Sequence, residues 1–188
     1  MPRRILYLIR NAEYNRTQID KDGNAPLTER GERQAQLTGH ALKDLPIERI
    51  FVSPHQQTIE TADIISQNMN DTELVIRFEL SQYSNIENTH DTKSLKPKVN
   101  SEQEHLEKAY RQFFVPPDAL NDVHQVLVSY GNIVLDLICY ATQVNPEIWA
   151  HMLINNTGIS IVSIDSEHEI ELSAFNDVRH LPGDIRTE

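Results

Sequence analysis

Short apolar stretches alternate with segments of helical periodicity along most of this chain, and that alternation limits the fold more than any other feature. The stretches are rich in Val, Ile, Leu and aromatic residues, which is typical of buried strands. They are Arg4 to Ile9, Arg49 to Ser53, Leu74 to Phe78 and Gln125 to Ser129, followed by a terminal hairpin of Ile159 to Ile164 and Glu169 to Ala174. Strands that alternate with helices favour a parallel sheet, whereas the hairpin favours an antiparallel edge.

Helices are predicted between these strands. Thr28 is a good N-cap for the first helix, which Pro46 ends, and Pro54 begins the second. Two more helices are expected at Leu106 to Phe114 and at Ile133 to Thr142. The predicted fold class is therefore α/β, with three α/β/α layers around a mostly parallel central sheet that has an antiparallel edge.

The length of the chain and its net charge indicate how many domains it forms and which classes of partner it can bind. The 188 residues predict a single domain, 1–188, in which the polar, aperiodic residues 81–101 form a long surface loop. The formal net charge of −11 repels phosphate backbones and anionic lipids, so neither nucleic acid nor membrane is an expected partner. No apolar stretch approaches the ~20 residues of a membrane span. The one cysteine, Cys139, indicates a reducing compartment, and a cytoplasmic location is expected.

Two polar loops stand where a ligand site is expected. Residues 10–13 follow the first strand and residues 129–132 follow the strand at Gln125 to Ser129, and α/β sheets bind ligands beyond the carboxyl ends of such strands. The fixed fork of donors on Arg10 suits a phosphate. From the residues alone, the alternative interpretation is that Arg10 forms a surface or structural ion pair.

Several motifs in order resemble the histidine phosphatase, or phosphoglycerate mutase-like, superfamily. Residues 10–15 are similar to its Arg-His-Gly opening, Leu27 to Ala35 to its LTxxGxxQA helix start, and Ser53 to Ala62 to its SPxxRAxxTA helix. Further segments resemble the branch of the mitochondrial serine/threonine protein phosphatase: Gly131 to Ile133, Pro146 to Trp149, Asn155 to Ser160 and Asp177 to Pro182. The resemblance implies a phosphoglycerate mutase-like fold with the family's site residues gathered in one cleft.

The family's active positions hold other residue types in this chain. The resemblance places Asn11 where the family has its phosphoryl-accepting His and Tyr130 where it has its second His. Gln57 stands at the second phosphate-binding Arg, and Gln82 stands at the general-acid Glu. In the close branch, Leu135 stands at the position of an Arg. Of the family's phosphate-site side chains only Arg10 remains. Arg10, Asn11, Gln57 and Tyr130 are the phosphate-binding positions that the resemblance implies, and none of the replaced positions is expected to be catalytic.

These replacements should remove the chemistry. The amide nitrogen of Asn11 is delocalised into its carbonyl and has no lone pair for attack on phosphorus. The amide of Gln82 cannot protonate a leaving group, which costs a factor of roughly 10²–10⁴ in rate. Tyr130, with an ordinary pKa near ~10, supplies a hydrogen bond and no charge. Anion binding through Arg10 is expected to be weak, about millimolar and salt-sensitive.

The predicted function is a catalytically inactive histidine phosphatase-like protein that acts as a binding or regulatory module. Its expected partner is another protein, with a weakly held phosphate or phospho-ligand and a homodimer as further expectations, and neither a cofactor nor a metal is expected. The alternative is a residual or altered phosphatase, a phosphomonoester or phosphoprotein hydrolase that uses His55 as a surrogate base or nucleophile. A third hypothesis is a purely structural subunit, in which loss of Arg10 has no functional effect.

Other polar residues are given structural roles. Ser53 and Ser129 are interpreted as hydrogen-bonding loop residues, because neither has an adjacent His. His180 is expected to pack or to support the site indirectly, and Trp149 to be a core or interface aromatic. The histidines expected to face solvent are His40, His90, His105, His124 and His168.

Overall fold

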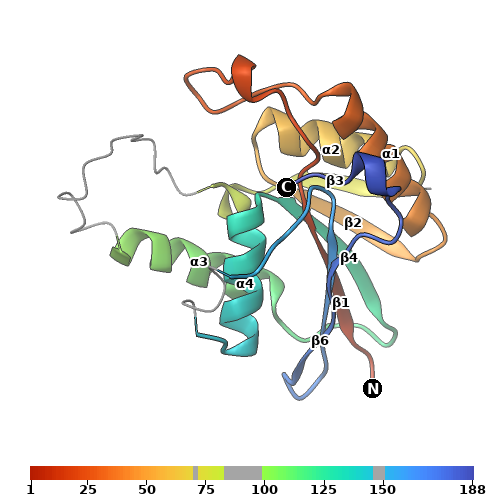
Figure 1. Cartoon of the computed structure of the whole chain (residues 1–188). Coiled ribbons are helices and arrows are strands. Elements are labelled where there is room, and N and C mark those ends of the chain that lie inside the picture. The colour runs from red at the N-terminus through yellow and green to blue at the C-terminus, as the bar shows by residue number, and fades with distance from the viewer. Residues whose placement is uncertain (70–71, 83–98, 146–150) are drawn as a thin grey trace.

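The computed structural model describes residues 1–69, 72–82, 99–145 and 151–188, and only the backbone of 99–101. These residues form one six-stranded sheet in the order β3-β2-β4-β1-β5-β6 (Figure 1). The parallel strands are β1 (Arg4–Arg10), β2 (Ile47–Val52), β3 (Glu73–Ile76) and β4 (Val123–Ser129). The antiparallel edge is β5 (Ile159–Ile164) with β6 (Ile170–Asp177). The α/β class with its mixed sheet is confirmed.

The helices differ from the sequence predictions mainly at their ends. They are α1 (Glu29–Leu42), α2 (Gln56–Ser66), α3 (Val99–Phe113) and α4 (Gly131–Thr142), with short 3₁₀ turns η1 (Arg16–Gln18), η2 (Phe78–Leu80) and η3 (Gly183–Ile185). Helix α2 starts at Gln56 because His55 is still extended and acts as the N-cap.

Helix α3 begins well before the predicted start at Leu106. Apart from Val99, residues 99–105 are polar and show no apolar period, so periodicity did not identify them, although a helix that has formed can extend through such a sequence. The predicted loop 81–101 is therefore wrong at 99–101, and its residues 83–98 lie outside the described part of the chain.

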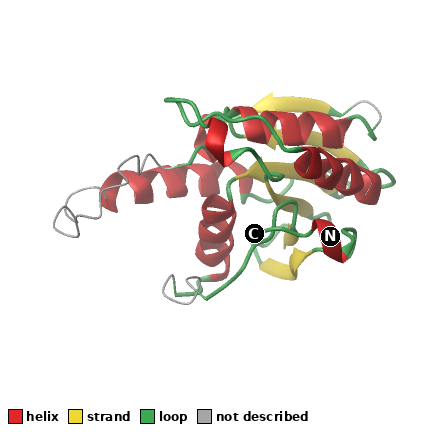
Figure 2. Ribbon diagram, turned by 45° about the horizontal axis from the view of Figure 1, so that its top comes forward, coloured by secondary structure: helices red, strands yellow, loops and turns green. Residues whose placement is uncertain are grey.

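Two hydrophobic cores flank the sheet, one on each face. Side chains alternate along β1, so Leu6 and Leu8 join the core under α3 and α4, while Tyr7 and Ile9 join the core under α1 and α2. Figure 2 shows helices on both sides of the strands. Among the described residues, no helix is both long enough and apolar enough to cross a membrane.

The carboxyl ends of β1, β2 and β4 meet at one edge of the sheet. Arg10 at the end of β1 is in register with Ser129 at the end of β4. The backbone N–H of Ser53, just after β2, donates to the carbonyl of Val128 (3.1 Å). These contacts bring the first loop, the second helix start and the late loop together, as the order of motifs predicts.

Candidate functional site

A cleft of about 450 Å³ opens at this edge of the sheet. It is lined by Arg10, Asn11, Tyr14, Gln82, Tyr130, Gly131, Asn132, Leu135, Met152, Leu153 and Ile154. The set includes most of the positions that the resemblance gathers in one cleft: Arg10, Asn11, Gln82, Tyr130 and Leu135. Gln57, which was predicted to line the same cleft, is not among these residues; it contacts the cleft residue Tyr130 through a hydrogen bond to its hydroxyl.

Arg10 extends from the end of β1 along Gly131, the first residue of α4. A Cβ at Gly131 would stand 3.0 Å from Arg10 Cδ, so the glycine leaves room for this side chain. Nη1 of Arg10 donates to the carbonyl of Ile154, and among the described residues Arg10 forms no ion pair. Burial, followed by the nearby Arg16, lowers the pKa of Arg10. The guanidinium stays charged, but the chain itself already uses one of its donors.

Asn11 is buried and is held on all sides by the chain. Its backbone N–H donates to Ser129 O (2.8 Å), and its carbonyl accepts from Asn156 Nδ2 (2.8 Å). Its side-chain Nδ2 donates to the carbonyl of Ala12 (2.8 Å). Asn156 is anchored in turn by Thr187, whose hydroxyl donates to its Oδ1 (3.0 Å). Asn11 therefore offers no nucleophile, and one of the two N–H donors of its side-chain amide is occupied.

Gln57 and Tyr130 form a neutral pair behind the cleft. Gln57 Nε2 donates to the Tyr130 hydroxyl oxygen (2.5 Å) and to Gly23 O (3.0 Å), and its Oε1 accepts from Ala25 N–H (3.3 Å). Burial, followed by Tyr14, raises the pKa of Tyr130, and the hydrogen bond from Gln57 opposes this only in part. The Tyr130 hydroxyl is therefore protonated at neutral pH. This pair adds no positive charge to the site.

His55 lies outside the cleft lining, although its ring packs edge-on against Tyr130 with centroids 5.3 Å apart. Its Nδ1 lies 3.1 Å from Ser53 Oγ, so the prediction that no His accompanies Ser53 is wrong. The extended backbone at His55 folds the ring back over Ser53, which strict sequence adjacency does not reveal. Ser53 is fully buried and is not an accessible nucleophile. Burial lowers the pKa of His55, partly opposed by Asp20.

Ser129 and His180 support the site from outside it. Ser129 Oγ donates to Leu80 O (2.7 Å), which holds the turn that precedes Gln82, so its hydrogen-bonding role is confirmed. His180 Nε2 lies 3.0 Å from Thr38 Oγ1, and the ring also bonds the backbone of Thr157. Burial is the main cause that lowers the pKa of His180. Because Thr157 N–H donates to Arg10 O (3.0 Å), His180 packs behind the end of β1.

The remaining histidines do not all face solvent as predicted. His40 and His168 are exposed, but His105 and His124 are half-buried, and His124 Nδ1 lies 3.0 Å from the Tyr7 hydroxyl. Neighbouring strands cover His124, which sequence context alone does not show. His90 and Trp149 lie outside the described residues. Within the described part of the chain, no group of three or more His, Cys, Asp or Glu residues could hold a metal.

Comparison with known proteins relates this site to a family. The profile described as "Histidine phosphatase superfamily (branch 1)" matches residues 6–116. "Serine/threonine-protein phosphatase Pgam5, mitochondrial" of Caenorhabditis elegans is 27% identical over 95% of this chain and 64% of that protein. The protein of the same name in Drosophila ananassae is 29% identical over 95% of this chain and 65% of its own length. The chain thus spans just under two thirds of these relatives.

Solved structures share the fold. Phosphoglycerate mutase from Plasmodium falciparum superimposes with a TM-score of 0.70 at 23% identity, over 97% of this chain and 96% of that one. Bacillus stearothermophilus YhfR gives a TM-score of 0.75 at 18% identity, over 94% of this chain and 98% of that one. The predicted phosphoglycerate mutase-like architecture is confirmed.

The expectation of a cytoplasmic location is wrong, because the relatives that match are named mitochondrial. The argument rested on Cys139, which is 3% exposed in the core, and burial raises its pKa. A buried thiol is inert in either redox environment. Its reduced state therefore carries no information about the compartment.

Proposed function

Because this chain belongs to branch 1 of the histidine phosphatase superfamily, and because the sequence resemblance places Asn11 and Tyr130 where the family has its two histidines, we propose that it is a catalytically inactive member that acts as a binding or regulatory module. The expected partner is another protein. The name of the relatives, serine/threonine-protein phosphatase, describes the activity that this chain has lost under the proposal.

The observation that carries the proposal is the state of Asn11. Phosphoryl transfer to the enzyme needs a basic lone pair aimed into the cleft, whereas the Asn11 amide is 1% exposed and bonded to Ala12 O. The described cleft lining contains no histidine that could substitute.

Two further features support the loss of catalysis. The Gln57–Tyr130 pair is neutral, so the charge that stabilises a phosphoryl transition state is missing at the back of the cleft. The cleft lining also includes the apolar side chains of Leu135, Met152 and Leu153. Among the described residues that line the cleft, Arg10 is the one cation available to a phosphate dianion, and it is already bonded to the Ile154 carbonyl.

We expect the wild-type protein to hydrolyse para-nitrophenyl phosphate no faster than the buffer blank. His55→Ala should leave that rate unchanged, since His55 Nδ1 contacts Ser53 and the ring lies outside the cleft. Asn11→His alone should gain less than about tenfold, because the acid and the second cation are still missing, and a missing acid alone costs roughly 10²–10⁴. Circular dichroism controls for folding. Turnover by wild type that His55→Ala abolishes would establish the residual phosphatase instead.

Phosphate should bind wild type with a Kd of about 1 mM, equivalent to roughly −4 kcal/mol, and more weakly as ionic strength rises. Arg10→Ala should abolish binding. Arg33→Ala, which removes the same charge from an exposed position on α1, should leave it within about twofold. Calorimetry or NMR titration with phosphate measures both. Micromolar binding by wild type, or equal binding by Arg10→Ala, contradicts this account of the cleft.

A further inference from the structure

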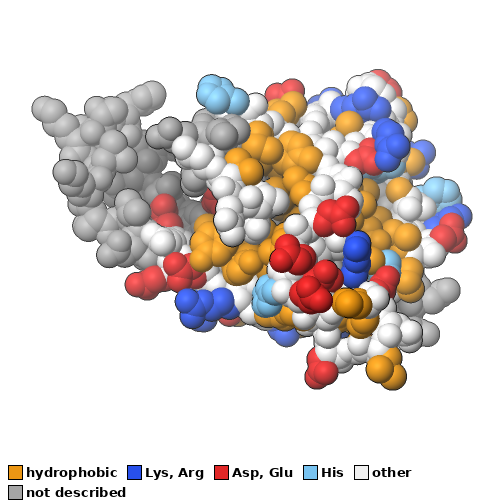
Figure 3. All heavy atoms as spheres, turned by 90° about the horizontal axis from the view of Figure 1, so that it is seen from below, with side chains coloured by type: hydrophobic (Ala, Val, Ile, Leu, Met, Phe, Trp, Pro, Cys, Tyr) orange, Lys and Arg blue, Asp and Glu red, His pale blue; other side chains and the backbone are white. Residues whose placement is uncertain are grey.

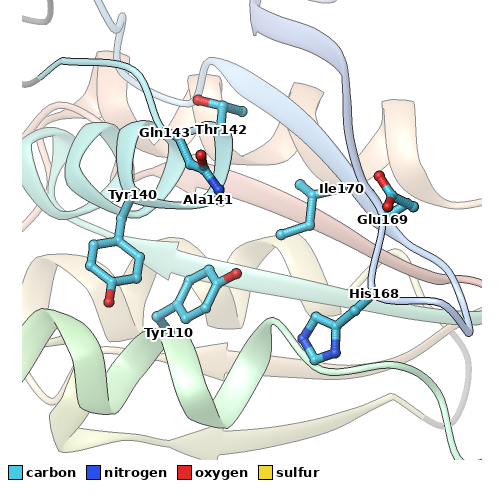
Figure 4. Close-up of a pocket in the computed structure, with 8 residues that line it drawn as sticks. All are labelled: Tyr110, Tyr140, Ala141, Thr142, Gln143, His168, Glu169 and Ile170. Carbon is cyan, nitrogen blue, oxygen red and sulfur yellow. The ribbon is translucent and has the colours of Figure 1, made fainter.

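A second hollow lies beside the C-terminal end of α4 (Figure 4). The cleft is at the other end of this helix, where Gly131 and Asn132 line it. It has a volume of about 670 Å³ and is bounded by Tyr110 of α3, by Tyr140 and Gln143 at the end of α4, and by residues 168–170 at the β5–β6 turn. An adjoining hollow of about 290 Å³ shares Tyr140 and Gln143 and reaches Asp136. We call the two together the α4 groove.

Aromatic rings form one wall of the α4 groove. The rings of Tyr110 and Tyr140 have centroids 4.7 Å apart and are tilted by 59°, and Tyr110 also stacks on Phe114 at 5.0 Å. Tyr140 is 40% exposed, so part of its side chain remains open to solvent. Tyrosine faces attract Lys and Arg cations through the ring quadrupole.

Negative groups lie at both ends of the α4 groove. Glu169 lines the larger hollow and Asp136 the smaller one, and no Lys or Arg is among the described residues that line either. Among described residues, Asp136 has no ion-pair partner. The groove also receives the C-terminal end of α4, which has a partial negative charge and no basic residue in its last turn.

His168 adds an acceptor to the same hollow. Its Nε2 lies 3.1 Å from the carbonyl of Phe114, and a carbonyl can only accept, so Nε2 carries the proton. In the neutral ring, Nδ1 is then an acceptor. Figure 3, the face seen from below, shows hydrophobic side chains exposed in its middle with acidic side chains beside them. A net charge of −11 adds a field that draws cations to the molecule.

We propose that the α4 groove binds an extended basic segment of a partner protein, with one Lys or Arg side chain at Glu169, a second at Asp136, and the intervening chain over Tyr140. Two carboxyl groups separated by an exposed aromatic ring suit successive basic residues of a peptide better than a small cation, which would occupy one end only. The groove is separate from the old active site, so this binding does not depend on whether the cleft is catalytic.

The test is fluorescence anisotropy with a fluorescein-labelled octapeptide of alternating Arg and Ser, and with a control peptide that has Glu in place of Arg. Wild type should bind the Arg peptide and not the Glu peptide. Glu169→Gln, Asp136→Asn and Tyr140→Leu should each weaken binding by about fivefold, the size of one partly exposed charge or cation–π contact.

Glu167→Gln is the matched control, because it removes the same charge from the same turn but lies outside the groove lining. It should change the Kd by less than about twofold. Asp136→Asn should fold normally: burial and Glu102 raise the pKa of Asp136 to about 6, so a neutral amide suits that position. If Glu167→Gln and Glu169→Gln weakened binding of the Arg peptide equally, net charge alone would explain the effect and the proposal would be overturned. Undetectable binding of the Arg peptide to wild type at millimolar protein concentration would also overturn it.

Discussion

Gly31→Ala is expected to lower the free energy of unfolding by about 3 kcal/mol. The clash should exceed the ordinary overpacking cost of about 1–3 kcal/mol, whereas the higher helix propensity of Ala gives back about 1 kcal/mol. A Cβ at Gly31 would stand 1.9 Å from the carbonyl oxygen of Glu13, which is backbone and cannot turn aside. That carbonyl also accepts from Thr28 N–H (3.0 Å), so moving it breaks the bond that joins the first loop to the start of α1. Urea unfolding measures the loss.

Gly183→Ala is the control for this variant. A Cβ there would meet no atom within 4 Å, so the free energy of unfolding should stay within about 0.5 kcal/mol of wild type. Because Glu13 lies two residues after Asn11 in the same loop, Gly31→Ala should also displace Asn11. Wild-type stability of Gly31→Ala would show that the loop does not pack on α1 as described.

Gln57→Ala is expected to lower the free energy of unfolding by about 2–3 kcal/mol. The substitution leaves the Gly23 carbonyl, the Ala25 N–H and the Tyr130 hydroxyl without the partner they share, and an unsatisfied buried polar group costs about 1–3 kcal/mol. We expect the total loss to stay near the upper end of the range for one unsatisfied group, because the neighbouring chain relaxes and the three losses do not add. Tyr130→Phe should cost only about 1 kcal/mol, since Gln57 Nε2 keeps Gly23 O.

Gln56→Ala is the matched control, because the neighbouring amide is exposed and bonds only the Glu60 side chain (2.7 Å). Its effect should stay within about 0.5 kcal/mol. Chemical denaturation of Gln57→Ala, Tyr130→Phe and Gln56→Ala measures the free energy of unfolding that each side chain contributes. If Gln56→Ala and Gln57→Ala were equally destabilising, the buried pair with Tyr130 would not contribute as described.

The local pattern of the sequence determined the sheet and the identity of the cleft loops. Short apolar runs predicted every described strand to within a few residues, because such runs are typical of strands that are buried on both faces of a sheet. Placement of Arg10, Asn11 and Tyr130 at one cleft followed from the order of motifs along the sheet. The early start of α3 could not be predicted, because residues 99–105 have no apolar period to report.

Tertiary structure alone decided what the cleft residues bond to. Arg10 ends on the carbonyl of Ile154, and Gln57 pairs with Tyr130, contacts between residues 144 and 73 positions apart. His55 reaches Ser53 only because the chain is extended between β2 and α2. Residue type and spacing limit which groups can bond, whereas the choice among partners depends on which backbone atoms the packed sheet brings within about 3 Å. The same packing, and no motif, assembles the α4 groove from α3, α4 and the β5–β6 turn.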